Sequence, residues 1–130
     1  MGVRHDQDHD EEARERWGHT DAYRHSAART KSYSDSDWTR IKAETEAIEA
    51  DFAAAMEEGA PPDSSAARAV AERARMHIDR RFYPCSHSMH VSLAEMYTVD
   101  PRFRAHYDDR AEGLATYVAA AIRANAASQG

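Results

Sequence analysis

Cysteine is almost missing from this sequence, and its scarcity limits how the chain can be held together. Cys85 is the only cysteine among 130 residues, so no disulfide can form within the chain. A protein without disulfides fits a reducing compartment, and we expect it in the cytoplasm. Runs of about 18 apolar residues, the length of a membrane span, are also missing. The polar N-terminus has no apolar segment of a signal peptide, so no membrane anchor is predicted.

A surplus of positive charge is missing as well. The chain has 17 lysines and arginines against 23 aspartates and glutamates, a net charge of -6, and its basic residues form no stripe. Nucleic-acid binding by this chain alone is therefore not expected, because phosphate contacts require clustered cations. The length suggests a single domain with a core of its own. We expect a monomer.

Motifs of catalysis are not found either. The sequence has no glycine-rich phosphate loop, no zinc-protease motif and no nucleophile elbow. His77 and Asp79 are two positions apart, so they would not face each other on a helix. We predict neither an enzyme nor a bound cofactor.

What the chain does have is alanine, with little glycine and no β-branched runs. This composition predicts an all-α fold of about five to seven helices. Serine, threonine or aspartate caps and the punctuating Gly59, Pro61-Pro62 and Pro84 mark the boundaries. The predicted helices cover about residues 20–29, 34–58, 64–83, 86–97, a short segment from 101, and 112–126. The helix from residue 34 is the most clearly amphipathic, and Trp38 on its apolar stripe is expected in the core.

The N-terminal third is expected to be the least stable part. Residues 1–10 have the composition of a disordered tail, and residues 11–33 carry few apolar side chains beyond Trp17 and Tyr23. These two aromatics either attach the N-terminal helices to the body or lie over a ligand. Residues 34–127 would form the core of the domain.

Residues 77–103 combine soft apolar side chains with neutral hydrogen-bonding groups. That mixture suits a pocket for a mostly neutral organic molecule better than a phosphate site. The candidate ligand-binding residues of this stretch are His77, Phe82, Tyr83, Cys85, His87, Met89, His90, Met96 and Tyr97.

Several of these residues also have a second interpretation. Cys85 is either a thiol activated by a nearby helix start or a small buried side chain. The histidines could form a loose metal set with Cys85, but no carboxylate or second cysteine completes it, and we predict no metal. The methionines either line a cleft or fill an ordinary core.

Several motifs together resemble one family. They run in order from about residue 12 to 127: Arg16-Trp17-Gly18, Thr20-Asp21-Ala22-Tyr23, Asp37-Trp38, Tyr83-x-Cys85, Met89-His90, Glu95-Met96-Tyr97, Asp100-Pro101-Arg102-Phe103 and Gly113-Leu114-Ala115. The chain resembles the TipAS-type antibiotic-recognition domain of thiostrepton-induced regulators. This resemblance implies a globin-like helical fold that binds a macrocyclic peptide or another hydrophobic antibiotic in a cleft.

The resemblance also implies how such a domain would work. The N-terminal helices, residues 11–33 here, would become ordered over the ligand. In the family, drug binding either switches a fused DNA-binding module of the MerR type or sequesters the drug. The sequence is compatible with a stand-alone binder and with a piece of a longer regulator.

Ser92 is the position where the chain departs from the family pattern. Members that capture thiopeptides carry a second cysteine there, which adds to a dehydroalanine of the drug. A neutral hydroxyl is a much poorer nucleophile than a thiolate. The departure predicts reversible binding or a ligand of another class.

Two functions of other classes remain open at this point. One is a metal- or haem-binding sensor that uses His77, His87 or His90. The other is a small enzyme that uses Cys85 for thiol addition.

Overall fold

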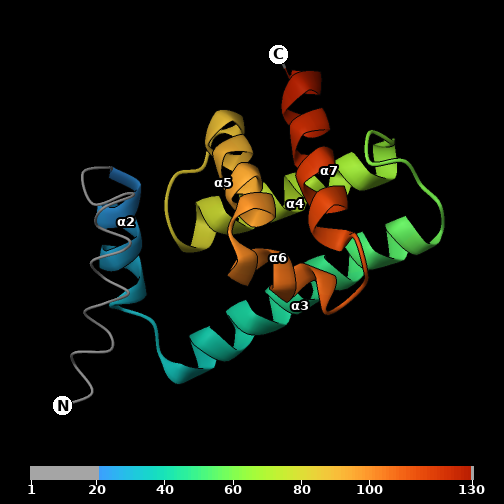
Figure 1. Cartoon of the computed structure of the whole chain (residues 1–130). Coiled ribbons are helices and arrows are strands. Elements are labelled where there is room, and N and C mark those ends of the chain that lie inside the picture. Colours follow the sequence, from blue (N-terminus) through green and yellow to red (C-terminus); the bar gives the residue numbers. More distant parts are fainter. Residues whose placement is uncertain (1–20, 130) are drawn as a thin grey trace.

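A computed structural model describes residues 21–129, except for the side chains of residues 21–23 and 25. This part of the chain folds into six helices and no strand: α2 (Asp21–Thr30), α3 (Asp35–Glu57), α4 (Ser65–Arg81), α5 (His87–Val99), α6 (Pro101–Asp108) and α7 (Leu114–Gln129) (Figure 1). The all-α prediction is confirmed. In the described range, no helix combines the length and the hydropathy of a membrane span.

Four helices begin at the caps that the sequence indicated. Ser34 accepts a hydrogen bond from the amide of Asp37 at 3.2 Å, and the Asp37 carboxylate accepts one from the amide of Ser34 at 3.0 Å. This reciprocal capping box satisfies two backbone donors that the first turn leaves free. The other three caps each accept one amide hydrogen bond and are Ser64, Ser86 and Asp100.

Two glycines set the limits of α3 and α7. Gly59 and Gly113 adopt φ angles of +81° and +82°, a left-handed conformation that glycine reaches without a steric penalty. Gly59 therefore ends α3 as predicted. Gly113 excludes Glu112 from α7, which begins at Leu114, two residues later than expected. The predicted start at Thr20 and the segments before it lie outside the described residues.

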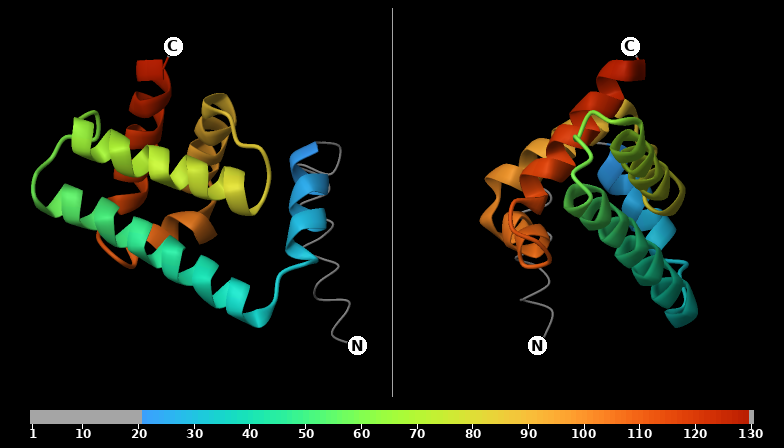
Figure 2. Two further views of the ribbon diagram at one scale, coloured as in Figure 1. Left: turned by 180° about the vertical axis from the view of Figure 1, so that it is seen from behind. Right: turned by 90° about the vertical axis from the view of Figure 1, so that its right-hand side faces the viewer.

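The helices from α3 onward form two layers. α3 and α4 run antiparallel as one layer, and α5, α6 and α7 cross them as the other (Figures 1 and 2). Phe52 of α3 and Leu114, Val118 and Ile122 of α7 are almost fully buried where the layers meet. Burying each such side chain stabilises the fold by about 1.5–3 kcal/mol.

α2 stands beside this two-layered body and contacts mainly the C-terminal end of α4 (Figure 2). The Arg29 guanidinium donates a hydrogen bond to the carbonyl oxygen of Asp79, and the Tyr33 hydroxyl donates one to the carbonyl oxygen of Arg81. The described part of α2 has no residue in either hydrophobic core cluster. This arrangement agrees with the low stability expected for the N-terminal part of the chain.

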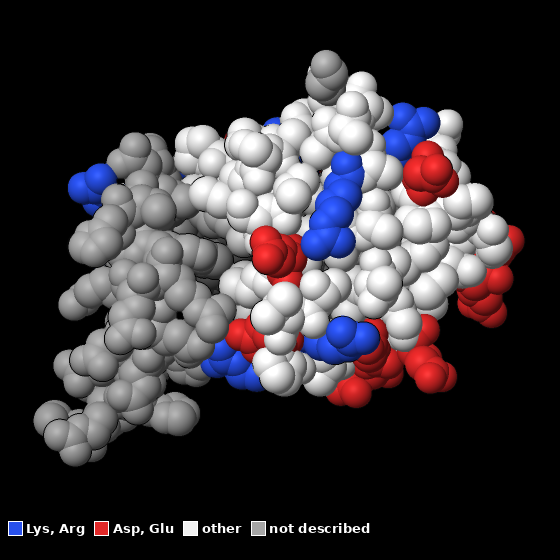
Figure 3. All heavy atoms as spheres, turned by 45° about the horizontal axis from the view of Figure 1, so that its top comes forward, with Lys and Arg blue, Asp and Glu red and all other residues white. Residues whose placement is uncertain are grey.

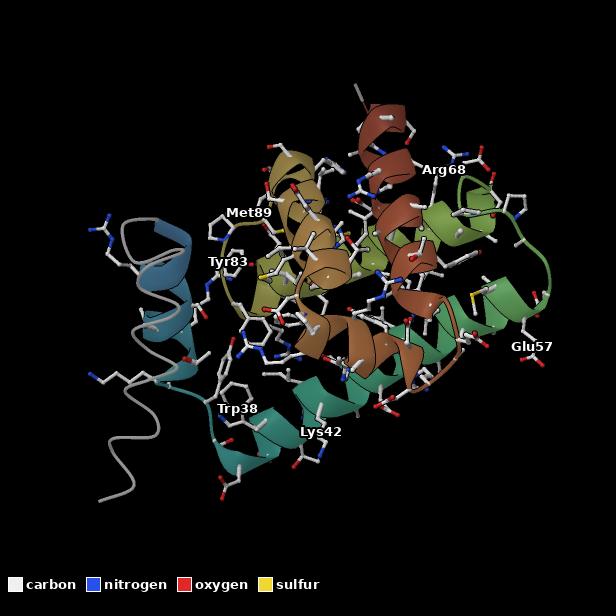
Figure 4. All side chains as sticks on the ribbon, viewed as in Figure 1. Trp38, Lys42, Glu57, Arg68, Tyr83 and Met89 are labelled. Carbon is white, nitrogen blue, oxygen red and sulfur yellow. The ribbon has the colours of Figure 1, made fainter. Side chains whose placement is uncertain are left out.

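Trp38 does not lie in the core, and that prediction was wrong. Its side chain is 41% exposed and makes an edge contact with Tyr33, with ring centroids 5.5 Å apart. The reason is geometric: the first turns of α3 extend past the helices that cover the rest of its apolar stripe (Figure 4). The apolar periodicity of α3 thus continues into turns that the neighbouring helices do not cover.

Candidate functional site

The connection between α4 and α5 is fixed through the backbone of Cys85. Its amide donates a hydrogen bond to the Asp79 carboxylate at 2.8 Å, and its carbonyl accepts one from Arg75 at 2.6 Å. With both backbone groups paired, the turn presents Tyr83 and Cys85 to Leu93 of α5. These three buried residues form a small second core, against which Phe82, Met89, Met96 and Tyr97 pack.

A groove runs along the exposed face of α5 on one side of this small core. It has a volume of about 470 Å³, and we call it the α5 groove. Its walls come from α5 and the start of α6: Met89, Ser92, Leu93, Glu95, Met96, Val99, Asp100 and Pro101. Val99 is 72% exposed and adds accessible apolar surface to the groove. Met89 and Tyr83 lie on the side of the body that looks toward α2 (Figure 4).

Charge is sparse around the groove. Glu95 is the exposed acidic group on its wall, whereas Asp100 is buried and accepts a hydrogen bond from the Arg102 guanidinium at 3.0 Å. On the face where α5 and α7 lie, charged side chains are isolated within a continuous uncharged area (Figure 3). A mainly apolar hollow with little charge favours a ligand with apolar surface.

A second hollow, the inner cavity, lies on the other side of α5 between the layers. It measures about 200 Å³. Its apolar lining comes from Ile48, Phe52, Ala74, Ile78, Phe82, Val118 and Ile122. Its polar lining comes from Thr45, Glu49, His77, His90, Tyr97 and Tyr107.

Burial favours the neutral forms of the histidines and of Tyr97 around the inner cavity. Desolvation lowers the pKa of His90 to about 4 and also lowers that of His77, although Glu44 accepts a hydrogen-bond contact from His77 at 3.1 Å. Burial raises the pKa of Tyr97 to about 12. At neutral pH His90 is therefore an uncharged hydrogen-bonding group, and burial shifts His77 in the same direction.

Cys85 is a buried thiol and not an activated one. It is 1% exposed, and burial raises its pKa to about 11. The thiolate that conjugate addition needs is thus scarce at neutral pH. The structure favours the second of the two interpretations given for this residue.

His87 faces away from both hollows. Its Nε2 lies 2.9 Å from the Glu72 carboxylate, which also accepts hydrogen bonds from Arg75 and from Asn125 of α7. Glu72 therefore ties α4 to α5 and α7. Within the described residues, no group of three or more histidine, cysteine, aspartate or glutamate side chains is placed to hold a metal ion.

The predicted site residues are thus divided between two hollows. His77, Phe82, His90 and Tyr97 line the inner cavity, whereas Met89, Ser92 and Met96 line the α5 groove. Tyr83 and Cys85 fill the small core between them. Trp17 lies outside the described residues, and for Tyr23 only its place in α2 is described.

Sequence reasoning missed Val99, Glu49 and Tyr107. Val99 lies three positions after Met96, so helical spacing could have added it to the groove. Glu49 and Tyr107 reach the inner cavity from α3 and α6, and only the crossing of these helices with α5 brings them together. No local signal in the sequence marks that crossing.

Comparison with known proteins agrees with this architecture. Residues 9–125 match the family model of the TipAS antibiotic-recognition domain. Over 118 residues, 91% of this chain, the sequence is 47% identical to the HTH-type transcriptional activator TipA of Streptomyces coelicolor and 34% identical to the HTH-type transcriptional activator mta of Bacillus subtilis. The aligned parts cover 47% and 45% of those regulators, so the chain spans about half their length.

A solved structure shares the fold. It is described as nosiheptide in complex with TipAS, from a thiopeptide antibiotic multidrug resistance system of Streptomyces lividans. The TM-score is 0.87 at 45% identity, and the match covers 95% of this chain and 86% of that one. The matched family is a recognition domain of transcriptional regulators and not a family of enzymes. Its model covers most of the sequence, and the chain therefore belongs to the TipAS antibiotic-recognition domain family.

Proposed function

We propose that this domain binds a hydrophobic peptide antibiotic of the thiopeptide class, reversibly, with the α5 groove as its main contact surface. The observation that carries the proposal is the row of accessible apolar side chains Met89, Met96 and Val99 on one face of α5. Ser92 lies within this row. The family membership of the chain and the nosiheptide complex of its relative support the ligand class.

The energetics suit a large ligand. Burying several hundred Å² of apolar surface at about 25 cal/mol per Å² contributes on the order of 10 kcal/mol before costs. Loss of rigid-body freedom and ordering of protein segments take back a large part of this gain. A ligand that covers the groove and also contacts residues outside it is therefore needed for tight binding.

Residues 11–33 supply the additional contact surface in this proposal. α2 has few contacts to the body, so it can move onto a ligand in the groove at little cost in existing interactions. Trp17 and Tyr23 would then cover apolar ligand surface. Residues 34–127 would act as the preformed core of the site.

The relatives support a proposal for the role of ligand binding. TipA and mta are transcriptional activators, and this chain corresponds to about half of each. We propose that ligand binding either sequesters the drug or acts as the effector signal for a DNA-binding module, in the cytoplasm. The domain itself would act as a monomer and contact no nucleic acid.

A charge placed in the groove tests this assignment. Val99→Lys puts an ammonium group where an apolar ligand would lie, and Ala54→Lys puts the same group on an exposed position near the far end of α3. We expect Val99→Lys to weaken nosiheptide binding at least tenfold, about 1.4 kcal/mol, with no loss of thermal stability.

Isothermal titration calorimetry would measure the dissociation constants of both variants. Ala54→Lys should bind like the unaltered chain. Equal affinities for the two lysine variants, or no binding of nosiheptide to the well-folded unaltered chain, would contradict the proposal.

A further inference from the structure

The inner cavity contains a hydrogen-bonding group that the protein leaves unused. His90 is 2% exposed, and neither of its ring nitrogens has a hydrogen-bond partner in the described part of the structure. Its Nδ1 is the one buried side-chain nitrogen or oxygen without a partner among those residues. Native proteins pair nearly all such atoms, so an exception on a cavity wall points to a missing partner.

The ionic and hydroxyl groups on the same wall are already engaged. Glu49 contacts His106 at 2.9 Å, His77 contacts Glu44 at 3.1 Å, and the hydroxyl of Thr45 donates to a backbone carbonyl at 3.0 Å. The hydroxyls of Tyr97 and Tyr107 form a hydrogen bond with each other. A neutral imidazole carries one donor and one acceptor nitrogen. His90 is therefore the group in this cavity that can direct a ligand.

The size and lining of the cavity define the ligand further. A cavity of about 150 Å³ lined by apolar residues holds a benzene molecule, and the inner cavity measures about 200 Å³. Phe52, Ile78, Phe82 and Ile122 offer flat or branched apolar surface on several sides.

This hollow is distinct from the α5 groove. His90 and Tyr97, seven positions apart, lie on one face of α5, whereas Met89, Ser92, Met96 and Val99 lie on another. Leu93, with Tyr83 and Cys85, fills the space between the two faces. A ligand can therefore occupy the inner cavity without contact to the groove.

We propose that the inner cavity is a second binding site, for a small neutral heteroaromatic molecule of about two fused rings that hydrogen-bonds to His90. Because the site needs no part of the groove, this proposal does not rest on antibiotic binding. It predicts that the domain binds two chemically different ligands at two places.

The test compares two probes of nearly equal shape without any antibiotic. Benzimidazole has a ring N–H donor and a ring nitrogen acceptor, and indene has neither. We expect benzimidazole to bind the unaltered chain at least tenfold more tightly than indene, and to shift the imidazole ¹⁵N resonances of His90 in histidine-labelled protein. In His90→Phe, which keeps an aromatic ring but removes both ring nitrogens, this preference should disappear.

Two cavity-filling variants locate the site. Ala74→Leu from α4 and Thr45→Leu from α3 each add bulk to the inner cavity, and two positions guard against one variant failing to fold. Either filling variant, if folded, should bind benzimidazole at least tenfold more weakly. Ser92→Ala in the groove should leave the affinity for benzimidazole unchanged. Equal affinity of the two probes, binding that the filling variants do not weaken, or no binding at all, as in a cavity that holds only water, would overturn the proposal.

Discussion

At the scale of single residues, Ser92 decides which chemistry the groove can perform. It is exposed between Met89 and Met96, and its hydroxyl donates a hydrogen bond to the carbonyl of Ser88 at 3.3 Å. The position is accessible to a ligand, but a hydroxyl does not ionise near neutral pH as a thiol does. If a thiopeptide occupies the groove as proposed, position 92 is accessible to it but carries no thiol nucleophile.

Replacing this hydroxyl by a thiol should make binding irreversible. In Ser92→Cys, the thiolate would add to the β-carbon of a dehydroalanine in a thiopeptide, and the α-carbon would take up a proton. Intact-mass spectrometry should then show the protein mass plus one full ligand mass, since nothing is eliminated.

The unaltered chain and Ser92→Ala are the controls. Both should keep their mass in the presence of the same thiopeptide, because burial raises the pKa of the remaining Cys85 to about 11. An adduct on the unaltered chain that disappears in Cys85→Ser would show that the buried thiol becomes accessible, against our interpretation.

Glu72 is the residue whose ionisation matters most clearly for stability. Hydrogen bonds from Arg75, with smaller effects of Asn125 and His87, lower its pKa from 4.5 to about 2. Because the folded-state pKa lies below the usual value, ionised Glu72 stabilises the fold fully above about pH 4.5. That contribution is lost as the pH falls from 4.5 toward 2.

Glu72→Gln should therefore cost about 1–2 kcal/mol of unfolding free energy at pH 7, a modest value because the side chain is partly exposed to solvent. The difference from the unaltered chain should shrink between pH 4.5 and pH 2 in urea titrations. Asp51→Asn is the matched control, since Asp51 pairs with Arg73 while both are half exposed. We expect it to change stability by less than about 0.5 kcal/mol at every pH. A Glu72→Gln effect that does not vary with pH would contradict the assigned role.

At the scale of helices, the caps were readable from the sequence and the neighbours of each helix were not. Ser34, Ser64, Ser86 and Asp100 act on amides two or three positions away, so local sequence specifies them. Trp38 was misjudged because burial depends on whether a second helix covers the stripe. The inner cavity combines residues of five helices, and no periodicity within one helix encodes how five helices cross.

α2 is the helix for which ligand dependence should be greatest. In the free domain its amides, Asp21–Thr30, should exchange with deuterium much faster than those of α3, because little packing would be lost when α2 opens. Saturating nosiheptide should slow exchange in α2 by at least tenfold.

Hydrogen–deuterium exchange followed by mass spectrometry reports both segments in one experiment. α7, which is buried in the core, serves as the internal reference and should change little. Exchange in α2 that is slow without ligand, or unchanged with it, would mean that this helix is a fixed part of the body.

At the scale of the whole molecule, the described residues form a two-layered body and one helix, α2, that has few contacts with it. Without ligand, the free energy of unfolding of a chain that lacks residues 1–30 should therefore lie within about 1 kcal/mol of that of the full chain. With nosiheptide at 100 times its dissociation constant, the full chain should gain about 2.7 kcal/mol by mass action. The shortened chain at the same ligand concentration should gain clearly less, because it binds more weakly.

Urea unfolding measures the stability of the full chain and of the shortened chain, each with and without nosiheptide. The comparison separates the contribution of residues 1–30 to folding from their contribution to binding. Equal ligand-induced stabilisation of both chains would assign the whole binding surface to the body.

The attachment of α2 to the body has a consequence for how members of this family can diverge. Arg29 and Tyr33 both donate to main-chain carbonyls of α4, at Asp79 and Arg81, and not to side chains. Every amino acid supplies such a carbonyl, so substitutions at positions 79 and 81 preserve the two acceptors. The docking of the N-terminal helix is therefore independent of which side chains stand at positions 79 and 81, whereas the amide of Cys85 still requires the Asp79 carboxylate.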